Sequence, residues 1–177
     1  LSGARVFIAA PGSVWNALGL TTGYNIEGQS FNFTAGGAVG TQDQPLLTKV
    51  SELAGTAGTV AGDIWISNDG ALTVKAIADG AGGINAGGKV HLLVKGPFTL
   101  ESFITSGGDT IIRTLDSAAN DDITIKTGAV INTKGRIVIL SGDDIHIETA
   151  SSLTAVTGVV LFGDFNGTQD EAAGYSD

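Results

Sequence analysis

Acidic residues recur at a regular spacing in the last third of the chain. The Asp-Asp pair at 121 and 122 returns at 143 and 144, and a related Gly-Asp-Phe-Asn phrase places the next Asp at 164. The oxygen-bearing residues of these three phrases are Asp121, Asp122, Asp143, Asp144, Asp164 and Asn166. Carboxylate and amide oxygens are the ligands that Ca²⁺ prefers, and a bound cation relieves the repulsion between stacked carboxylates. The spacing therefore predicts a Ca²⁺ site, and Ca²⁺ is the only cofactor that the sequence indicates.

The same residue types have a second, purely structural use. Asp and Asn are common in tight turns because their side chains hydrogen-bond to nearby backbone groups. Each acidic phrase adjoins a short β-branched segment, which is where turns are expected. The sequence alone therefore leaves two alternatives open: the acidic residues bind Ca²⁺, or they only form turns and bind no metal.

No residue pattern typical of a known class of catalytic site occurs in the sequence. The chain has no cysteine, and neither His91 nor His146 has a second histidine at ligand spacing. Both histidines are expected to be outward-facing strand residues. The nucleophile-elbow phrase Gly-x-Ser-x-Gly and the phosphate-binding phrase Gly-x-x-x-x-Gly-Lys-Ser/Thr do not occur. We therefore predict no catalytic residues.

A Gly-rich phrase returns at almost constant intervals through the first half of the chain. Its closing β-branched residues are Val14, Val39, Ile64 and Val90, which lie 25, 25 and 26 positions apart. A fixed period of this length, with glycine turns and no helical pattern between them, indicates one supersecondary unit stacked on copies of itself.

Short β-branched segments separated by turn residues fill the last third of the chain. The segments that begin near Ile123, Val130 and Ile137 each return after 22 or 23 positions. Their counterparts lie at Ile145, Leu153 and Val159. Three strands in each coil is the arithmetic of a triangular parallel β-solenoid, where every strand pairs with its counterpart one coil away. Stacking residues 123–127 on 145–149 also places Ile on Ile and Lys126 beside Glu148.

The regular pattern has one predicted interruption. Residues 96–120 disturb the period, because the next Gly-rich phrase closes at Ile111, 21 positions after Val90, and Ile123 follows only 12 positions later. We expect an irregular coil or a protruding loop there. Leu46–Ala54 is expected to form loop and short strand.

Three phrases carry Gly-rich turns followed by alternating apolar residues: Ala35–Thr41, Gly62–Ile66 and Asn68–Val74. They resemble the repeat units of filamentous-haemagglutinin-type adhesins and related giant repetitive bacterial surface proteins. The resemblance implies a right-handed parallel β-helix on a secreted or cell-surface protein, with structural or adhesive duties and no catalytic residues. Together with the period, it predicts an all-β chain with about three short strands in each coil, and a coil length between 22 and 26 positions. Residues 1–177 are then a single domain of about seven coils, as a segment of a longer repetitive protein.

Composition limits the partners of such a solenoid. The 177 residues carry a net charge of -9, which makes nucleic acid an unfavourable partner. No apolar run approaches the roughly 20 residues of a membrane span, so we expect no direct membrane insertion. Open solenoid ends present unpaired strand edges, so we expect self-association or continuation into neighbouring repeats.

The expected external ligand is a host or environmental glycan or protein. Aromatic side chains are frequent contact residues, and the candidates are Trp15, Trp65, Phe98 and Phe103. The alternative function is a β-helix polysaccharide-binding or polysaccharide-degrading enzyme. Such an enzyme needs paired carboxylates in a groove supplied with aromatics, whereas only 6% of this chain is aromatic.

Overall fold

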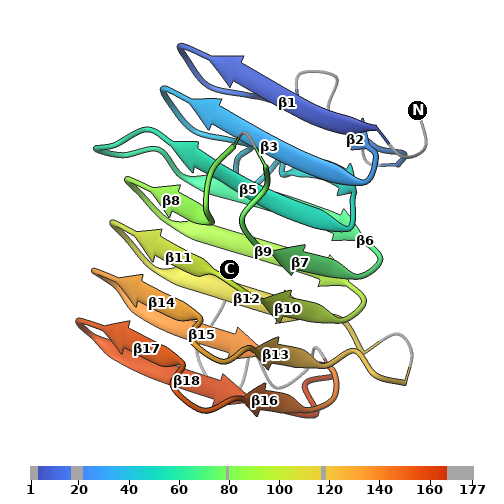
Figure 1. Ribbon diagram of the computed structural model, residues 1–177, viewed down its shortest axis with the longest axis vertical. Helices are drawn as coiled ribbons and strands as arrows, with labels where there is room; N and C mark the ends of the chain where they lie inside the picture. Colours follow the sequence, from blue (N-terminus) through green and yellow to red (C-terminus); the bar gives the residue numbers. More distant parts are fainter. Residues whose placement is uncertain (1–3, 17–21, 79, 117–118, 167–177) are drawn as a thin grey trace.

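The computed structural model describes residues 4–16, 22–78, 80–116 and 119–166. These residues form eighteen β-strands and no helix, so none of them lies in a helix that could cross a membrane. All the strand pairs in this part of the chain are parallel. The strands stack into about seven coils of a β-solenoid (Figure 1). The predicted all-β parallel β-helix is confirmed.

The strands belong to two sheets, and each coil passes through sheet A and then through sheet B. Sheet A holds β1 (Arg5–Ala10), β3 (Ser30–Ala35), β5 (Glu52–Ala57), β7 (Leu72–Val74), β8 (Ile84–Ala86), β10 (Phe98–Leu100), β11 (Phe103–Ser106), β13 (Ile123–Ile125), β14 (Val130–Thr133), β16 (Ile145–Ile147) and β17 (Ser152–Ala155). Sheet B holds β2 (Ile26–Glu27), β4 (Leu46–Lys49), β6 (Ile64–Asp69), β9 (Val90–Lys95), β12 (Thr110–Thr114), β15 (Arg136–Leu140) and β18 (Gly158–Phe162). We number the coils 1 to 7: β1–β2, β3–β4, β5–β6, β7–β9, β10–β12, β13–β15 and β16–β18.

The type of coil changes in the middle of sheet A. β5 is one continuous strand, and both β7 and β8 of the next coil pair with it: Leu53 lies opposite Val74, and Gly55 lies opposite Ile84. The described residues between β7 and β8, 75–78 and 80–83, lie outside the sheet, and we call them the β7–β8 loop (Figure 1). Coils 4 to 7 therefore have the predicted three strands, whereas coils 1 to 3 have one long strand in sheet A.

The recurring Gly-rich phrase marks one column of sheet B. Val14, Val39, Ile64 and Val90 are successive partners one coil apart, so the predicted period of the first half is confirmed. The column continues through Thr110 in coil 5.

The predicted interruption is shorter than expected. An irregular coil over residues 96–120 is wrong for most of that range, because β10, β11 and β12 lie there in regular register with their neighbours. The extra residues follow Thr114, where the chain takes 27 positions from Thr110 to its partner Ile137. The disturbance that the sequence shows is therefore one insertion between two regular coils.

The step in the last third is also more uniform than predicted. Val130 pairs with Ser152 and Ile131 with Leu153, so the partner of Val130 lies one position earlier than the predicted Leu153. The difference arises because β17 begins with a serine on its outer side, which carries no apolar signal in the sequence.

A side-chain oxygen closes the turn before sheet B from one coil to the next. Asp63 Oδ1 accepts a hydrogen bond from the backbone N–H of Lys89 at 2.7 Å. The equivalent pairs are Asp109 with Arg136 at 2.8 Å and Ser13 with Ala38 at 3.0 Å. A Cβ on Gly88 would lie 2.0 Å from Asp63 Oδ1, so the second glycine of the phrase leaves room for the acceptor.

Alternate side chains of the strands fill one apolar interior. In β9, Val90, Leu92 and Val94 are buried between residues that are more exposed. The interior columns are mostly Ile, Leu and Val, and Phe31 and Phe33 fill the N-terminal coils. Burial of this aliphatic surface is the main favourable term in folding, at roughly 25 cal/mol per Å² removed from water.

The outer face of sheet A is covered locally by the β7–β8 loop. Ile77 in this loop is buried, and the backbone N–H of Ala81 donates to Asn32 Oδ1 at 3.4 Å. Asn32 points outward from β3, yet it is buried because the loop lies over it. A loop of coil 4 therefore touches a strand of coil 2.

The outer face of sheet B is covered near its C-terminal end. Phe165 is buried against Val138 and Leu140 of β15, and the Arg113 guanidinium lies 4.7 Å from the centre of its ring. The chain after β18 thus folds back over the sheet and shields apolar residues that face away from the core.

The pairing predicted for β13 and β16 is confirmed. Ile123 lies opposite Ile145, and the Lys126 ammonium lies 2.8 Å from Glu148 Oε1. Thr127 donates to the other carboxylate oxygen, from its backbone N–H at 2.9 Å and from its hydroxyl at 3.0 Å. These hydrogen bonds, that of Lys126 first, lower the pKa of Glu148 from 4.5 to about 2.

Replacing Gly88 with Ala should destabilise the fold by about 1–3 kcal/mol, because the new Cβ would displace Asp63 Oδ1 from the Lys89 N–H. Gly12→Ala is the matched control, since its Cβ would meet no atom within 4 Å. Urea unfolding of both variants checks this. Equal losses in the two would show that the acceptor contact does not explain the glycine.

Glu148→Gln should reduce stability above pH 4.5 and have progressively less effect as the pH falls toward 2. The carboxylate contributes stability only while it is ionised in the folded state, and its folded pKa lies below its unfolded value. Thermal unfolding of both proteins across this pH range is the measurement. A difference between them that is constant from pH 7 to pH 2 would contradict the role of the ion pair.

Candidate functional site

The predicted acidic phrases do form a column on the molecule. Asp143 Oδ2 accepts the backbone N–H of Asp121 at 2.7 Å, and the backbone N–H of Asp164 donates to the Asp143 carbonyl at 2.9 Å. Beside them, Asp122 Oδ1 accepts the backbone N–H of Asp144 at 3.1 Å. Four of the six predicted residues are thus joined in pairs by turn hydrogen bonds, which is the structural use of Asp that the sequence left open.

Buried hydroxyls hold these turns in place. The Thr114 hydroxyl donates to the Asp121 carbonyl at 2.6 Å and accepts the backbone N–H of Gly142 at 2.9 Å. The Ser141 hydroxyl donates to the Asp144 carbonyl at 2.8 Å. Thr114 and Ser141 are both fully buried, so the backbone that carries the carboxylates is fixed from inside the solenoid.

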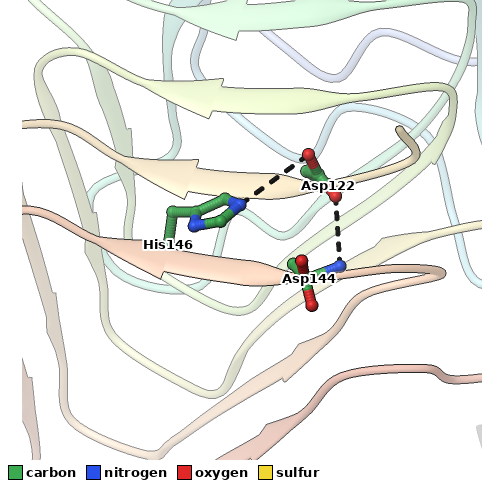
Figure 2. A group of neighbouring side chains, drawn as sticks. All are labelled: Asp122, Asp144 and His146. Carbon is green, nitrogen blue, oxygen red and sulfur yellow. Dashed lines mark hydrogen bonds and ion pairs between the residues drawn. The ribbon is translucent and has the colours of Figure 1, made fainter. Parts of the chain in front are cut away.

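Three side chains converge on the outer surface of this column: Asp122, Asp144 and His146 (Figure 2). One ligand atom from each lies within 4.8 Å of the others, and His146 Nε2 is 3.8 Å from Asp122 Oδ2. Asp144 directly precedes β16 and His146 lies within it, two positions further on, so the two side chains point to the same side. Asp122 reaches the same face from the turn before β13.

The ligand set favours a different cation from the one predicted. Ca²⁺ prefers oxygen ligands only, whereas an imidazole nitrogen with two carboxylates suits Zn²⁺ and similar transition metals. Asp144 and His146 are exposed, so an ion could enter from solvent and keep water ligands. His146 is not among the predicted ligands. Its signal in the sequence is the Asp-x-His spacing on one strand together with an Asp 22 positions before Asp144.

The remaining predicted ligands lie apart from this group of three. Asp121 is buried and Asp143 is partly buried in the turns. Asp164 and Asn166 are exposed on either side of Phe165, where the chain turns back over sheet B. The residues described in the structure therefore do not bring all six predicted ligands around one point.

The aromatic candidates separate into core and surface. Phe98 is buried in the core, so it cannot contact an external ligand without unfolding. Trp65 packs edge-on against His91 with the ring centres 4.7 Å apart, beside a recess of about 150 Å³ that Gln42 and Leu93 also line. Trp15 and Phe103 are exposed. Trp65 is the predicted aromatic that lies at a recess on the face of sheet B.

A second groove, of about 440 Å³, runs beside the turn between the two sheets and includes Glu27, Lys49 and Asp69. The Lys49 ammonium lies 3.7 Å from Glu27 and 5.3 Å from the centre of the Tyr24 ring. The Tyr24 hydroxyl donates to Asp69, and this bond raises the pKa of the phenol. Both carboxylates of the groove therefore already have a partner within the protein.

Comparison with known proteins finds no matching family model, no matching curated protein and no matching solved structure.

Zn²⁺ added to metal-free protein should raise its melting temperature, because an ion bound only by the folded site adds its binding free energy to the stability. His146→Gln should remove this shift, whereas His91→Gln, which changes the other imidazole, should retain it. The Ca²⁺ expectation is checked in the same assay, where Ca²⁺ should raise the melting temperature of a chelator-treated sample if the acidic column binds it. A melting temperature that responds to neither ion would leave these Asp residues as turn formers.

Proposed function

We propose that this chain is a non-enzymatic extracellular scaffold, the stalk, fibre or adhesive segment of a bacterial surface protein. The observation that carries the proposal is the unbroken stacking of about seven coils around one apolar interior. Both sheets continue from the first coil to the last, and insertions leave the solenoid as loops without interrupting either sheet. Such a solenoid lengthens by the same step with each coil that is added, which suits a spacer or a display surface.

Hydrogen-bond direction supports this role. In a solenoid of parallel strands the inter-strand hydrogen bonds run along the long axis, and each coil adds one strand spacing of about 4.8 Å. The length is therefore set by the number of coils. Ion pairs between successive coils, such as Glu27 with Lys49 and Lys75 with Glu101, add modest stability along the same direction.

An adhesive role requires a surface that can bind a ligand. The recess beside Trp65 offers an aromatic ring, the imidazole of His91 and the amide of Gln42 within one small area. Aromatic rings with adjacent amide groups suit the apolar face and hydroxyls of a sugar, or an apolar side chain of a protein. We assign the expected glycan or protein ligand to this recess.

The rival function is a polysaccharide-binding or polysaccharide-degrading enzyme. The groove beside Glu27 and Asp69 is the observation that favours it, since glycoside hydrolysis uses two carboxylates. Against it, Glu27 is paired with Lys49, and Asp69 accepts the hydroxyl of Tyr24.

Incubation of the protein with a panel of neutral and acidic polysaccharides should release no reducing ends and no unsaturated products. If products are released, and Glu27→Gln or Asp69→Asn abolishes the release without changing the melting temperature, the chain is an enzyme and the scaffold function is wrong.

The extracellular location is tested on intact producing cells, where added protease should digest the chain. Full protection on intact cells, with digestion after lysis, would contradict the extracellular location.

The Trp65→Ala variant should reduce binding to glycan or protein-coated surfaces by roughly tenfold or more, as expected for removal of a central aromatic contact. Trp15→Ala is the control, because Trp15 is exposed but lies outside the recess lining. Equal binding by the wild type and both variants would remove the recess from the adhesive surface.

A further inference from the structure

The two ends of the solenoid can be compared by following each interior column from coil to coil. One column of sheet A runs through Ile147, Ile125, Leu100, Val74, Leu53, Phe31 and Val6. Another runs through Leu153, Ile131, Ile104, Ile84, Gly55, Phe33 and Ile8. In sheet B the column is Val159, Ile137, Thr110, Val90, Ile64, Val39 and Val14. Each of these three columns starts and ends with an aliphatic residue.

The last coil exposes interior residues that the coil before it buries. Ile147, Val159 and Leu161 are 45, 44 and 43% exposed. Their partners in coil 6 are Ile125, Ile137 and Ile139, and all three are 0% exposed. Coil 6 is covered by coil 7, whereas no described strand pairs with coil 7 on its other side. One more coil in register would therefore bury these side chains.

The strand edges at the two ends are also open. Among the residues described, β16, β17 and β18 each pair on one side only, and β1 pairs only with β3. Open edges of this kind present unpaired N–H and C=O groups that can pair with another strand.

We propose that the last coil of one molecule accepts the first coil of a second copy of this chain, in the register that the solenoid already uses. Ile147 then lies opposite the partner copy's Val6, Leu153 opposite its Ile8, and Val159 opposite its Val14. The contact is head to tail and does not close on itself, so it generates a filament. It deepens the scaffold function proposed above and rests on it.

The structure contains a related junction inside one molecule, with the order of the two coil types reversed. Coil 7 is split in sheet A, whereas coil 1 has the continuous strand β1. Coils 3 and 4 show that a split coil can stack on a continuous one, because β7 and β8 both pair with β5. The intermolecular junction uses the same pairing of a split coil with a continuous one, in the opposite order along the axis.

Charge favours head-to-tail contact over contact between two like ends. Arg5 is the one charged side chain of residues 4–16, and Glu27, the other charged side chain described in coil 1, is paired with Lys49 of coil 2. Extending the column of Arg5 through Ser30, Glu52, Thr73, Thr99, Thr124 and His146 places it over His146, which lies between Asp144 and Glu148 on the outer face. Two C-terminal ends would instead bring these carboxylates together, which is repulsive.

Sedimentation and negative-stain electron microscopy over a range of protein concentrations test the association. The wild-type chain should form lengthening filaments, and Ile147→Lys or Val159→Lys should weaken association by at least roughly tenfold, because either places a charge on the buried face. Val156→Lys is the control, since Val156 is exposed in the turn between β17 and β18 and faces neither end column. Equal loss in the control would overturn the proposed contact.

The register is tested by disulfide formation between copies, because the natural chain has no cysteine. Ala9 and Thr154 occupy the same outward column, so Ala9→Cys and Thr154→Cys proteins, mixed and oxidised, should form heterodimers across strands about 4.8 Å apart. Ser152→Cys with Ala9→Cys is the control, since an offset of two residues separates the Cα atoms by about 8 Å. Equal cross-linking of both pairs would overturn the register.

Failure of this proposal differs from failure of the scaffold function. If the wild-type chain stays monomeric at every concentration and still unfolds cooperatively, the head-to-tail contact is wrong and the scaffold function is unaffected. Cleavage of a polysaccharide overturns the scaffold whether or not the chain forms filaments.

Discussion

Coil-on-coil hydrogen bonding in fixed register is the constraint on which the rest of this structure depends. A parallel strand can pair on both sides only if the coil above and the coil below keep the same inward and outward alternation. A slip of one residue between Ile125 and Ile147 would turn the interior face of the last coil toward solvent. The chain therefore varies in its loops and turns, and it keeps its strands in phase.

Much of this constraint is readable in the sequence, because it acts on residue types. The column from Val14 to Val90 is visible as a period, and Lys126 and Glu148 are visible as opposite charges one coil apart. The sequence does not show that the single strand β5 is followed in the next coil by two strands, β7 and β8. A loop that leaves and rejoins a sheet changes the length of a coil without changing the apolar pattern of its strands. The same insertion effect made residues 96–120 look irregular, although three regular strands lie there.

The sequence predicts where the candidate site lies, but not fully which residues form it. The regular step between the acidic phrases correctly places Asp122 next to Asp144, since backbone register decides which turns are neighbours. It does not show which carboxylates are occupied by backbone N–H groups, as that of Asp143 is, or that His146 lies beside Asp122. Those properties depend on side-chain direction at the edge of a strand, and a single sequence carries little information on it.

The β7–β8 loop changes how the solenoid would respond to a pulling force. A simple solenoid has contacts only between adjacent coils, so it can unravel from one end a coil at a time. Here Ala81 of coil 4 bonds to Asn32 of coil 2, across 49 positions in the chain. Under tension applied at the N-terminal side, this contact holds coils 2 to 4 together, so we expect these three coils to unfold in one step. A second contact of this kind lies near the other end, because Phe165 of coil 7 packs on β15 of coil 6 and lies against Arg113 of coil 5. Each end of the solenoid is therefore tied across three coils.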